Sequence, residues 1–372
     1  MEAGSGRKPL AFKAVTVAAA VMVAALLLAT PSAQTFIKDV VRSPFEPRYP
    51  EEVTYSMERR LTVTAVGGEV SSYTFDISEP KDIVESGQVV QKVNSVTYSP
   101  EVMDRSIRYG QDWVTWSGEA IPGGSSVTCT VVYDITVRTH IWDIDEDDSL
   151  HVQDVPESLK DAYLRDEWLM NMTSPAVAAQ AEEIVGDETN VYIILKEIYE
   201  WMRENISYST YHGSEPRSSE QMLRTMAGDC DDQSILFASL ARAAGVPAWL
   251  QLGALYVQAE DRWGGHAWLQ AYIPLKEGGG ENVTIDLVND DFLVRQPNRF
   301  ADFTDDGDAR HLTDYYYTFS STFDRRTGTP LYTEEYVRLN YEESYKKVSR
   351  GAVYDLAPEI ILPGTAPRPL RI

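Results

Sequence analysis

Apolar and polar residues alternate along much of the chain between Val53 and Arg138, which is the period of β-strands that bury one face. The alternation is clearest around Cys129, where every second residue from 127 to 137 is apolar. Glycine-containing turns at 67–68, 110–112 and 122–124 separate the alternating runs. Several short strands with this punctuation predict a β-sandwich-like domain over residues 51–142.

The period becomes helical further along the chain. Apolar residues three or four apart predict a helical run from Glu182 to Asn205, interrupted at Gly186, and a second helix from about Cys230 to Ala244. Gly245 and Pro247 follow where a helix is expected to end. Further strands are expected at Leu250–Val257, His266–Ile273 and Val283–Val288. The predicted fold class is therefore α+β, with the β-sandwich preceding an α+β core.

Length and charge narrow the class of protein. A chain of 372 residues suggests two domains with tails. Its net charge of −24 argues against nucleic acid as a partner, because phosphates call for clustered lysine and arginine. The sequence contains no phosphate-binding loop, dinucleotide-binding glycine pattern or Gly-x-Ser-x-Gly turn, so no cofactor is expected.

The N-terminus carries a targeting signal over residues 1–35. Three basic residues precede an uncharged apolar stretch from Ala14 to Thr30. Its 17 residues would span roughly 25 Å as a helix, slightly less than a hydrocarbon core of about 30 Å. Two interpretations stay open: an uncleaved membrane anchor, which the length favours, and a signal peptide cleaved near Pro31. Both predict that the rest of the chain lies outside the cytoplasm.

The remaining boundaries follow from composition. The predicted segments are a proline-containing linker at 36–50, an acidic linker at 143–164, a catalytic domain at 165–330 and a C-terminal extension at 331–372. The acidic run Asp143–Asp148 is faintly similar to a calcium loop, but Asp148 stands where the sharp turn of such a loop requires glycine. A solvated segment between domains is the favoured interpretation.

The two cysteines have different settings. Cys129 lies on the apolar face of its predicted strand, where a thiol is usually buried and inert. Cys230 stands at the start of the second helix. A disulfide between them is a disfavoured alternative, because it would join the two domains and silence Cys230.

Cys230, His266 and Asp286 have the residue types of a thiol acyl-transfer site. A thiol nucleophile needs a base, and the base needs an acceptor that orients it. If Asp229 caps the helix, Cys230 lies in its first turn, where the helix dipole favours a thiolate by about 0.3–1 kcal/mol, too little to replace the base. Each residue also has an ordinary alternative: a core cysteine, a hydrogen-bonded strand histidine and a solvated aspartate.

The predicted strands give the base and its partner a common setting. His266, Trp268 and Gln270 share one face of their strand, and Ala267 and its alternate neighbours form an apolar face. In an antiparallel hairpin of suitable register, His266 and Asp286 become cross-strand neighbours, so that Asp286 orients the imidazole.

Several motifs resemble the transglutaminase-like superfamily, a branch of the papain-like thiol enzymes. The resemblance runs through Gly-Asp-Cys-Asp-Asp-Gln at 228–233, Leu-Ala-Arg-Ala-Ala-Gly-Val-Pro-Ala at 240–248, Gly253, His-Ala-Trp at 266–268 and Ile-Asp at 285–286, and covers roughly residues 165–300. It implies a nucleophile helix packed on an antiparallel sheet, with Cys230 as nucleophile, His266 as general base and acid, and Asp286 as orienting residue.

Departures from the family pattern concern the substrate pocket. Trp249 stands where the family usually has a basic residue, and Leu287 where a proline commonly follows the aspartate. The backbone N–H of Cys230 would be one oxyanion donor, and Tyr208 or Tyr211 is a candidate for another.

Two classes of function are therefore expected. The first is an extracytoplasmic enzyme that attacks an amide of a protein or peptide and passes the acyl group to water or to an amine. The second is a non-catalytic surface module that binds a partner with the same fold. A metal site made by the three residues is a weaker alternative, since the sequence offers no other cluster of metal ligands.

Overall fold

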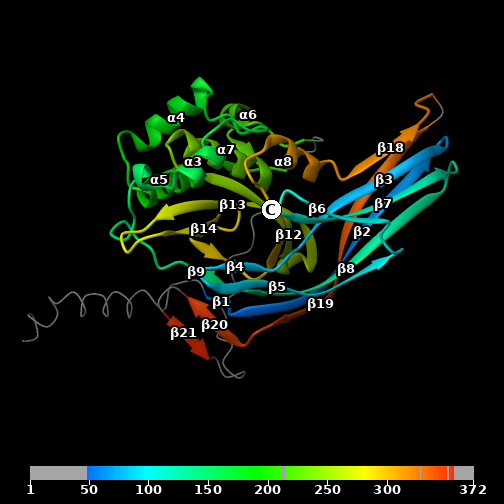
Figure 1. Ribbon diagram of the computed structural model, residues 1–372, viewed down its shortest axis with the longest axis horizontal. Coiled ribbons are helices and arrows are strands. Elements are labelled where there is room, and N and C mark those ends of the chain that lie inside the picture. Colours follow the sequence, from blue (N-terminus) through cyan, green and yellow to red (C-terminus); the bar gives the residue numbers. More distant parts are fainter. Residues whose placement is uncertain (1–47, 211–214, 327, 350–351, 356–372) are drawn as a thin grey trace, which may run out of the picture.

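The alternating region forms most of a two-sheet β-sandwich in the computed structural model, which describes residues 48–210, 215–326, 328–349 and 352–355 (Figure 1). One sheet has the order β19-β2-β8-β5-β4 and the other β18-β3-β7-β6. Their strands are β2 (Glu52–Val66), β3 (Val70–Glu79), β4 (Ile83–Glu85), β5 (Gln88–Ser99), β6 (Asp104–Arg108), β7 (Gln111–Ile121), β8 (Ser126–Arg138), β18 (Phe319–Phe323) and β19 (Thr329–Glu343).

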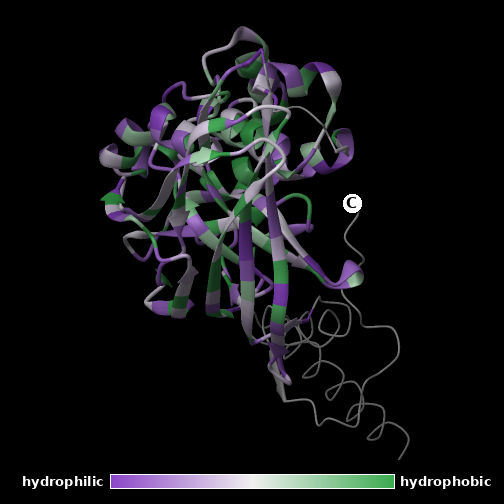
Figure 2. Cartoon of the chain, turned by 90° about the vertical axis from the view of Figure 1, so that its right-hand side faces the viewer, coloured by the Kyte–Doolittle hydropathy of each residue, from purple (hydrophilic) through white to green (hydrophobic). Residues whose placement is uncertain are grey.

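The interior of the sandwich follows the alternation of the sequence. Every second residue of β2 is buried, from Val53 to Ala65, and all of these side chains except that of Arg59 meet those of β3, β7 and β8 in one apolar cluster. Figure 2 shows the alternation as bands of hydrophilic and hydrophobic residues along the long strands. Cys129 is buried in this cluster. Both Cys129 and Cys230 are free thiols.

The sandwich takes two strands from the far end of the chain. β18 pairs with β3, and β19 pairs with β2 along almost its whole length. The predicted ranges assigned residues 319–343 to the catalytic domain and the C-terminal extension, whereas here they complete the β domain. Sequence pattern shows that a segment is a strand but not which strand it pairs with.

The α+β core that follows confirms the predicted fold class. Its central antiparallel sheet has the order β15-β14-β13-β12-β17. Its elements are β12 (Ala248–Val257), β13 (Arg262–Pro274), β14 (Gly280–Asp286), β15 (Asp291–Phe292), β17 (Arg299–Thr304), α4 (Pro175–Val185), α5 (Val191–Asn205), α6 (Ser219–Thr225), α7 (Cys230–Ala243) and α8 (Ala309–Tyr316). The predicted helical run is two helices, because the chain turns at Gly186, whose φ is +52°.

The two faces of the central sheet have different neighbours. Ala267, Leu269 and Ala271 of β13 pack in one apolar cluster with α4, α5 and α7. Figure 1 shows these helices gathered on one side of β12–β14 and the long sandwich strands on the other. On the opposite face Gln270 lies 3.3 Å from Glu85 of β4, so the polar face of the sheet meets the sandwich through buried hydrogen bonds.

Short elements connect these layers. They are β1 (Tyr49–Pro50), β20 (Lys346–Ser349) and β21 (Ala352–Asp355) in one small sheet, β9 (His140–Ile141) paired with β16 (Val294–Arg295), β10 (Ser207–Tyr208) parallel to β11 (Ala227–Gly228), α3 (Glu157–Tyr163), and the 3₁₀ turns η2 (Val152–Asp154) and η3 (Gln258–Glu260). The acidic segment is anchored rather than free, because Ile144 and Val155 are buried in the helical core.

The predicted targeting segment and most of the 36–50 linker lie outside the described residues. Within the part of the chain that is described, no helix is long and apolar enough to cross a membrane.

Candidate active site

The thiol of Cys230 lies where the first turn of α7 meets β13. Asp229 caps the helix by accepting the N–H of Asp232, whose side chain in turn accepts the N–H of Asp229. The backbone N–H of Ala267 is directed at the Cys230 sulfur. The nucleophile candidate is therefore beside the residue that follows His266.

His266 and Asp286 form a buried pair on adjacent strands. Nε2 of His266 is 2.7 Å from Oδ2 of Asp286, and both side chains are almost fully buried. Leu269 lies opposite Ile285, so the histidine and the aspartate are diagonal rather than directly opposite neighbours, a separation that side chains of this size can bridge. With Nε2 engaged, Nδ1 is the ring nitrogen left for a thiol proton.

Residues that no sequence motif indicated surround Asp286. The side-chain amide of Asn289 donates to Asp286 Oδ2 over 2.8 Å, and its backbone N–H donates to Oδ1 over 3.2 Å. Arg299 of β17 makes an ion pair with Asp286 and a second one, at 2.5 Å, with Asp291. Asn289 is within the same turn as Asp286, but Arg299 reaches it only because β17 folds back beside β12.

Burial determines the protonation states of His266 and Cys230. Burial lowers the pKa of His266 to about 3, and the cation of Arg299 acts in the same direction. Burial raises the pKa of the Cys230 thiol well above its ordinary value, and the charges of Asp231 and Asp229 add to this effect. The weak preference of the helix terminus for a thiolate is thus outweighed, and at neutral pH the site holds a neutral thiol and a neutral imidazole.

Asp231 is a further acidic group beside the sulfur. The thiol donates to Oδ1 of Asp231 over 3.7 Å. Burial, followed by the charge of Asp229, raises the pKa of Asp231 to about 7. Tyr316 of α8 lies next to this carboxyl and to the thiol.

Of the two oxyanion candidates, Tyr208 lies near the thiol and Tyr211 lies outside the described residues. β10 runs parallel to β11, which places Tyr208 opposite Gly228, two residues before Cys230. Burial, with the nearby Cys230 and Asp229, raises the pKa of Tyr208 to about 12. Its phenol therefore keeps its proton at neutral pH.

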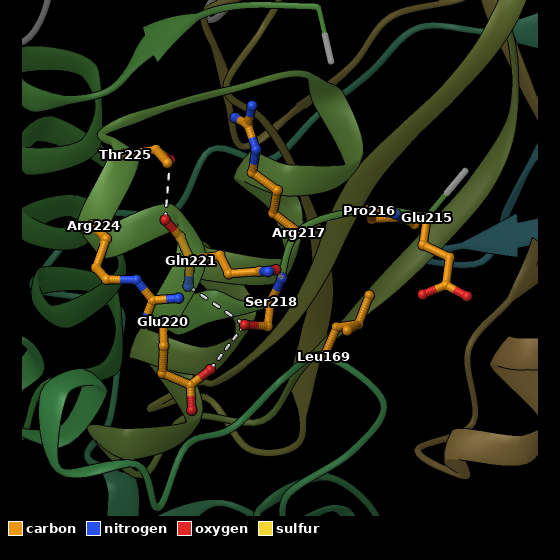
Figure 3. A pocket seen from close by; sticks show the side chains of 9 residues that line it. All are labelled: Leu169, Glu215, Pro216, Arg217, Ser218, Glu220, Gln221, Arg224 and Thr225. Carbon is orange, nitrogen blue, oxygen red and sulfur yellow. Dashed lines mark hydrogen bonds between the residues drawn. The ribbon is translucent and has the colours of Figure 1, made fainter. Parts of the chain in front are cut away.

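A hollow of about 670 Å³ opens beside α6 (Figure 3). Arg217 and Arg224 line it together with Glu215 and Glu220, and none of the three candidate catalytic residues is among its lining residues. The backbone N–H of Arg217 donates to Asp232 of α7 over 2.6 Å. The hollow thus neighbours the nucleophile helix without opening onto the thiol. Among the described residues, no group of three or more His, Cys, Asp or Glu side chains is arranged to hold a metal ion.

Comparison with known proteins identifies the class. Residues 178–281 match the model of the transglutaminase-like superfamily, and this part of the chain is a transglutaminase-like core. No curated protein matches the chain significantly in sequence.

Several solved structures match the chain at low sequence identity. A candidate cysteine protease from Cytophaga hutchinsonii is 16% identical, with a TM-score of 0.56 over 79% of this chain and 93% of its own. A candidate protease from Parabacteroides distasonis is 14% identical, with a TM-score of 0.26 over 70% of this chain and 48% of its own. The periplasmic domain of TgpA from Pseudomonas aeruginosa is 13% identical, with a TM-score of 0.31 over 63% of this chain and 90% of its own. The Cytophaga structure supports the fold, and a thiol enzyme is the general class that this fold suggests.

Proposed function

We propose that the protein is an extracytoplasmic thiol enzyme that cleaves amide bonds of proteins or peptides through a thioester on Cys230. Two contacts on neighbouring residues of β13 support the proposal. The Cys230 sulfur lies against the backbone N–H of Ala267, and the neighbouring His266 is 2.7 Å from Asp286. The basic and apolar N-terminal segment supports a location outside the cytoplasm, with the membrane as a partner.

In the acylation step His266 acts as a general base. Its neutral Nδ1 accepts the thiol proton while the sulfur attacks the amide carbonyl carbon, and Asp286 stabilises the imidazolium that forms. The carbonyl oxygen becomes an oxyanion near the first-turn N–H of Cys230, with the protonated Tyr208 as a candidate second donor. Collapse of the intermediate breaks the C–N bond, and the leaving amine takes the proton from His266.

Deacylation reverses these roles with a new nucleophile. Water or a primary amine gives a proton to His266 and attacks the thioester carbonyl, and the thiol recovers that proton as it leaves. Water gives net hydrolysis, whereas an amine gives a new amide and hence crosslinking.

The test uses the full-length chain with a glutamine-containing protein and a labelled primary amine. Label that is incorporated by wild type and lost in Cys230→Ala supports transamidation, and Cys230-dependent fragments without label support hydrolysis. Cys129→Ala is the matched control, because Cys129 is buried in the sandwich and should leave either activity unchanged.

A thiol probe separates catalysis from the alternative of a binding module. We expect iodoacetamide to alkylate Cys230 more slowly in His266→Ala than in wild type. Equal rates would refute the catalytic proposal and leave a non-catalytic module with this fold.

A further inference from the structure

We propose that Arg299 is a positioning residue of this site, which keeps Asp286 ionised and in place to orient His266. The inference rests on the proposed function, since it assigns a role within the same thiol–imidazole–carboxylate arrangement.

Arg299 touches the buried pair from two sides. Its guanidinium is fully buried, makes the ion pair with Asp286 and lies over Trp268, with its central carbon 5.7 Å from the ring centroid. Trp268 is itself stacked beside His266 at 5.8 Å between ring centroids. Arg299 therefore contacts both Asp286, which accepts the hydrogen bond of His266, and Trp268, whose ring stacks beside the imidazole.

The register of the sheet explains why a cation is needed. Asp286 and Asp291 are directly opposite each other on β14 and β15, and the side chain of each is 1% exposed. Two buried carboxylates at directly opposite positions repel each other, and burial by itself disfavours the ionised form of each. Arg299 lies between them and pairs with both, a geometry that the planar guanidinium suits.

Asp291 is itself held in place by hydrogen bonds, so it can fix the position of Arg299. Both oxygens of Asp291 accept from the amide of Gln296, at 2.9 and 2.8 Å. The hydroxyl of Tyr49 in β1 donates to Asp291 over 3.4 Å. A chain of contacts thus runs from His266 through Asp286, Arg299 and Asp291 to the first described strand.

If Arg299 acts through Asp286, the two residues are not independent. Without the cation, Asp286 can take up a proton or turn away, and it then no longer accepts the Nε2 proton of His266. Arg299→Met should therefore slow the reaction of Cys230 about as much as Asp286→Asn, by about tenfold or more for a lost charge-assisted contact.

The experiment is a double-mutant cycle on the full-length protein, with the rate of Cys230 alkylation by iodoacetamide as the readout. We expect the double variant Asp286→Asn/Arg299→Met to be no slower than the slower single variant. The matched control is Arg295→Met, because Arg295 is also fully buried and lies 6.0 Å from Trp268, but pairs with Glu85 rather than Asp286. We expect it to retain the wild-type alkylation rate within about threefold.

Either of two results would overturn the proposal. One is a double variant whose slowing equals the product of the two single effects, as for independent structural roles. The other is an Arg299→Met rate that matches that of the Arg295→Met control. If Arg299→Met lacks a cooperative thermal transition, the cycle is run with Arg299→Gln, which removes the charge but keeps a polar side chain; the same results are expected and the same two would overturn the proposal. Failure of the proposed function would be recognised by a different result, namely that Cys230 is alkylated as fast in His266→Ala as in wild type.

Discussion

Replacing Asp231 with asparagine should make Cys230 more reactive above neutral pH. The Asp231 oxygen is 3.7 Å from the sulfur, so an ionised carboxylate opposes formation of the thiolate. Asparagine has nearly the same size and removes the charge, and its amide can donate to the sulfur, which acts in the same direction.

The size of the effect follows from the distance. Two unit charges 3.7 Å apart repel by about 4.5 kcal/mol at an effective dielectric constant of about 20, and by about 1.1 kcal/mol in water. Because Asp231 is partly exposed, solvent screens this repulsion, and the value in water sets the minimum effect. A repulsion of about 1.1 kcal/mol corresponds to a rate increase of about sixfold on its removal, because alkylation follows the population of thiolate.

The pH dependence gives the prediction a sign. The pKa of Asp231 is about 7, so the wild-type carboxyl is mostly neutral at pH 5.5 and mostly ionised at pH 8.5. The rate of iodoacetamide alkylation of Cys230 should therefore be similar in the two proteins at pH 5.5 and differ at pH 8.5. Asp82→Asn, an exposed change in the β domain, serves as the control. No gain at pH 8.5, or an equal gain at both pH values, would contradict this prediction.

Three further predictions concern stability. Arg242→Met should lower the free energy of unfolding by about 3–5 kcal/mol, because it removes a fully buried cation that contacts Glu167 at 2.9 Å and Asp305 at 3.5 Å. Urea unfolding measures this loss, and a value below about 1 kcal/mol would contradict the prediction. Gly253→Ala should lower the free energy of unfolding by about 1–3 kcal/mol, because the added Cβ would lie 2.0 Å from the carbonyl oxygen of Phe300. Gly265→Ala is the control and should lower it less in the same assay, because no atom lies within 4 Å of its added Cβ. The melting temperature should fall between pH 6.5 and pH 8.5. Three buried carboxyls of the native protein have raised pKa values, about 8 for Glu167 and about 7 for Asp231 and Asp302, so they lose their protons in this range, whereas the same groups in the unfolded chain have already lost theirs. A melting temperature that rises over this range would contradict the prediction.

Local patterns predicted the elements of the site well, because capping and periodicity depend on neighbours in the chain. The helix was expected from about Cys230 and begins there, with Asp229 as its cap. The apolar and polar faces of the His266 strand were also predicted, since successive side chains of a strand alternate between faces. Arg299 had no such signal, because nothing in its local sequence shows that β17 pairs with β12.

The order of residues along the chain was enough to identify the reactive groups: a thiol at a helix start, an imidazole on a strand and an aspartate on the next strand. It also determined the fold class, since hydrophobic period distinguishes strands from helices. The tertiary structure alone decided the diagonal register of His266 and Asp286, the addition of β18 and β19 to the sandwich, and the neutral resting state of the site. These depend on pairing between distant segments and on burial, and burial is a property of the whole packed molecule rather than of any stretch of chain.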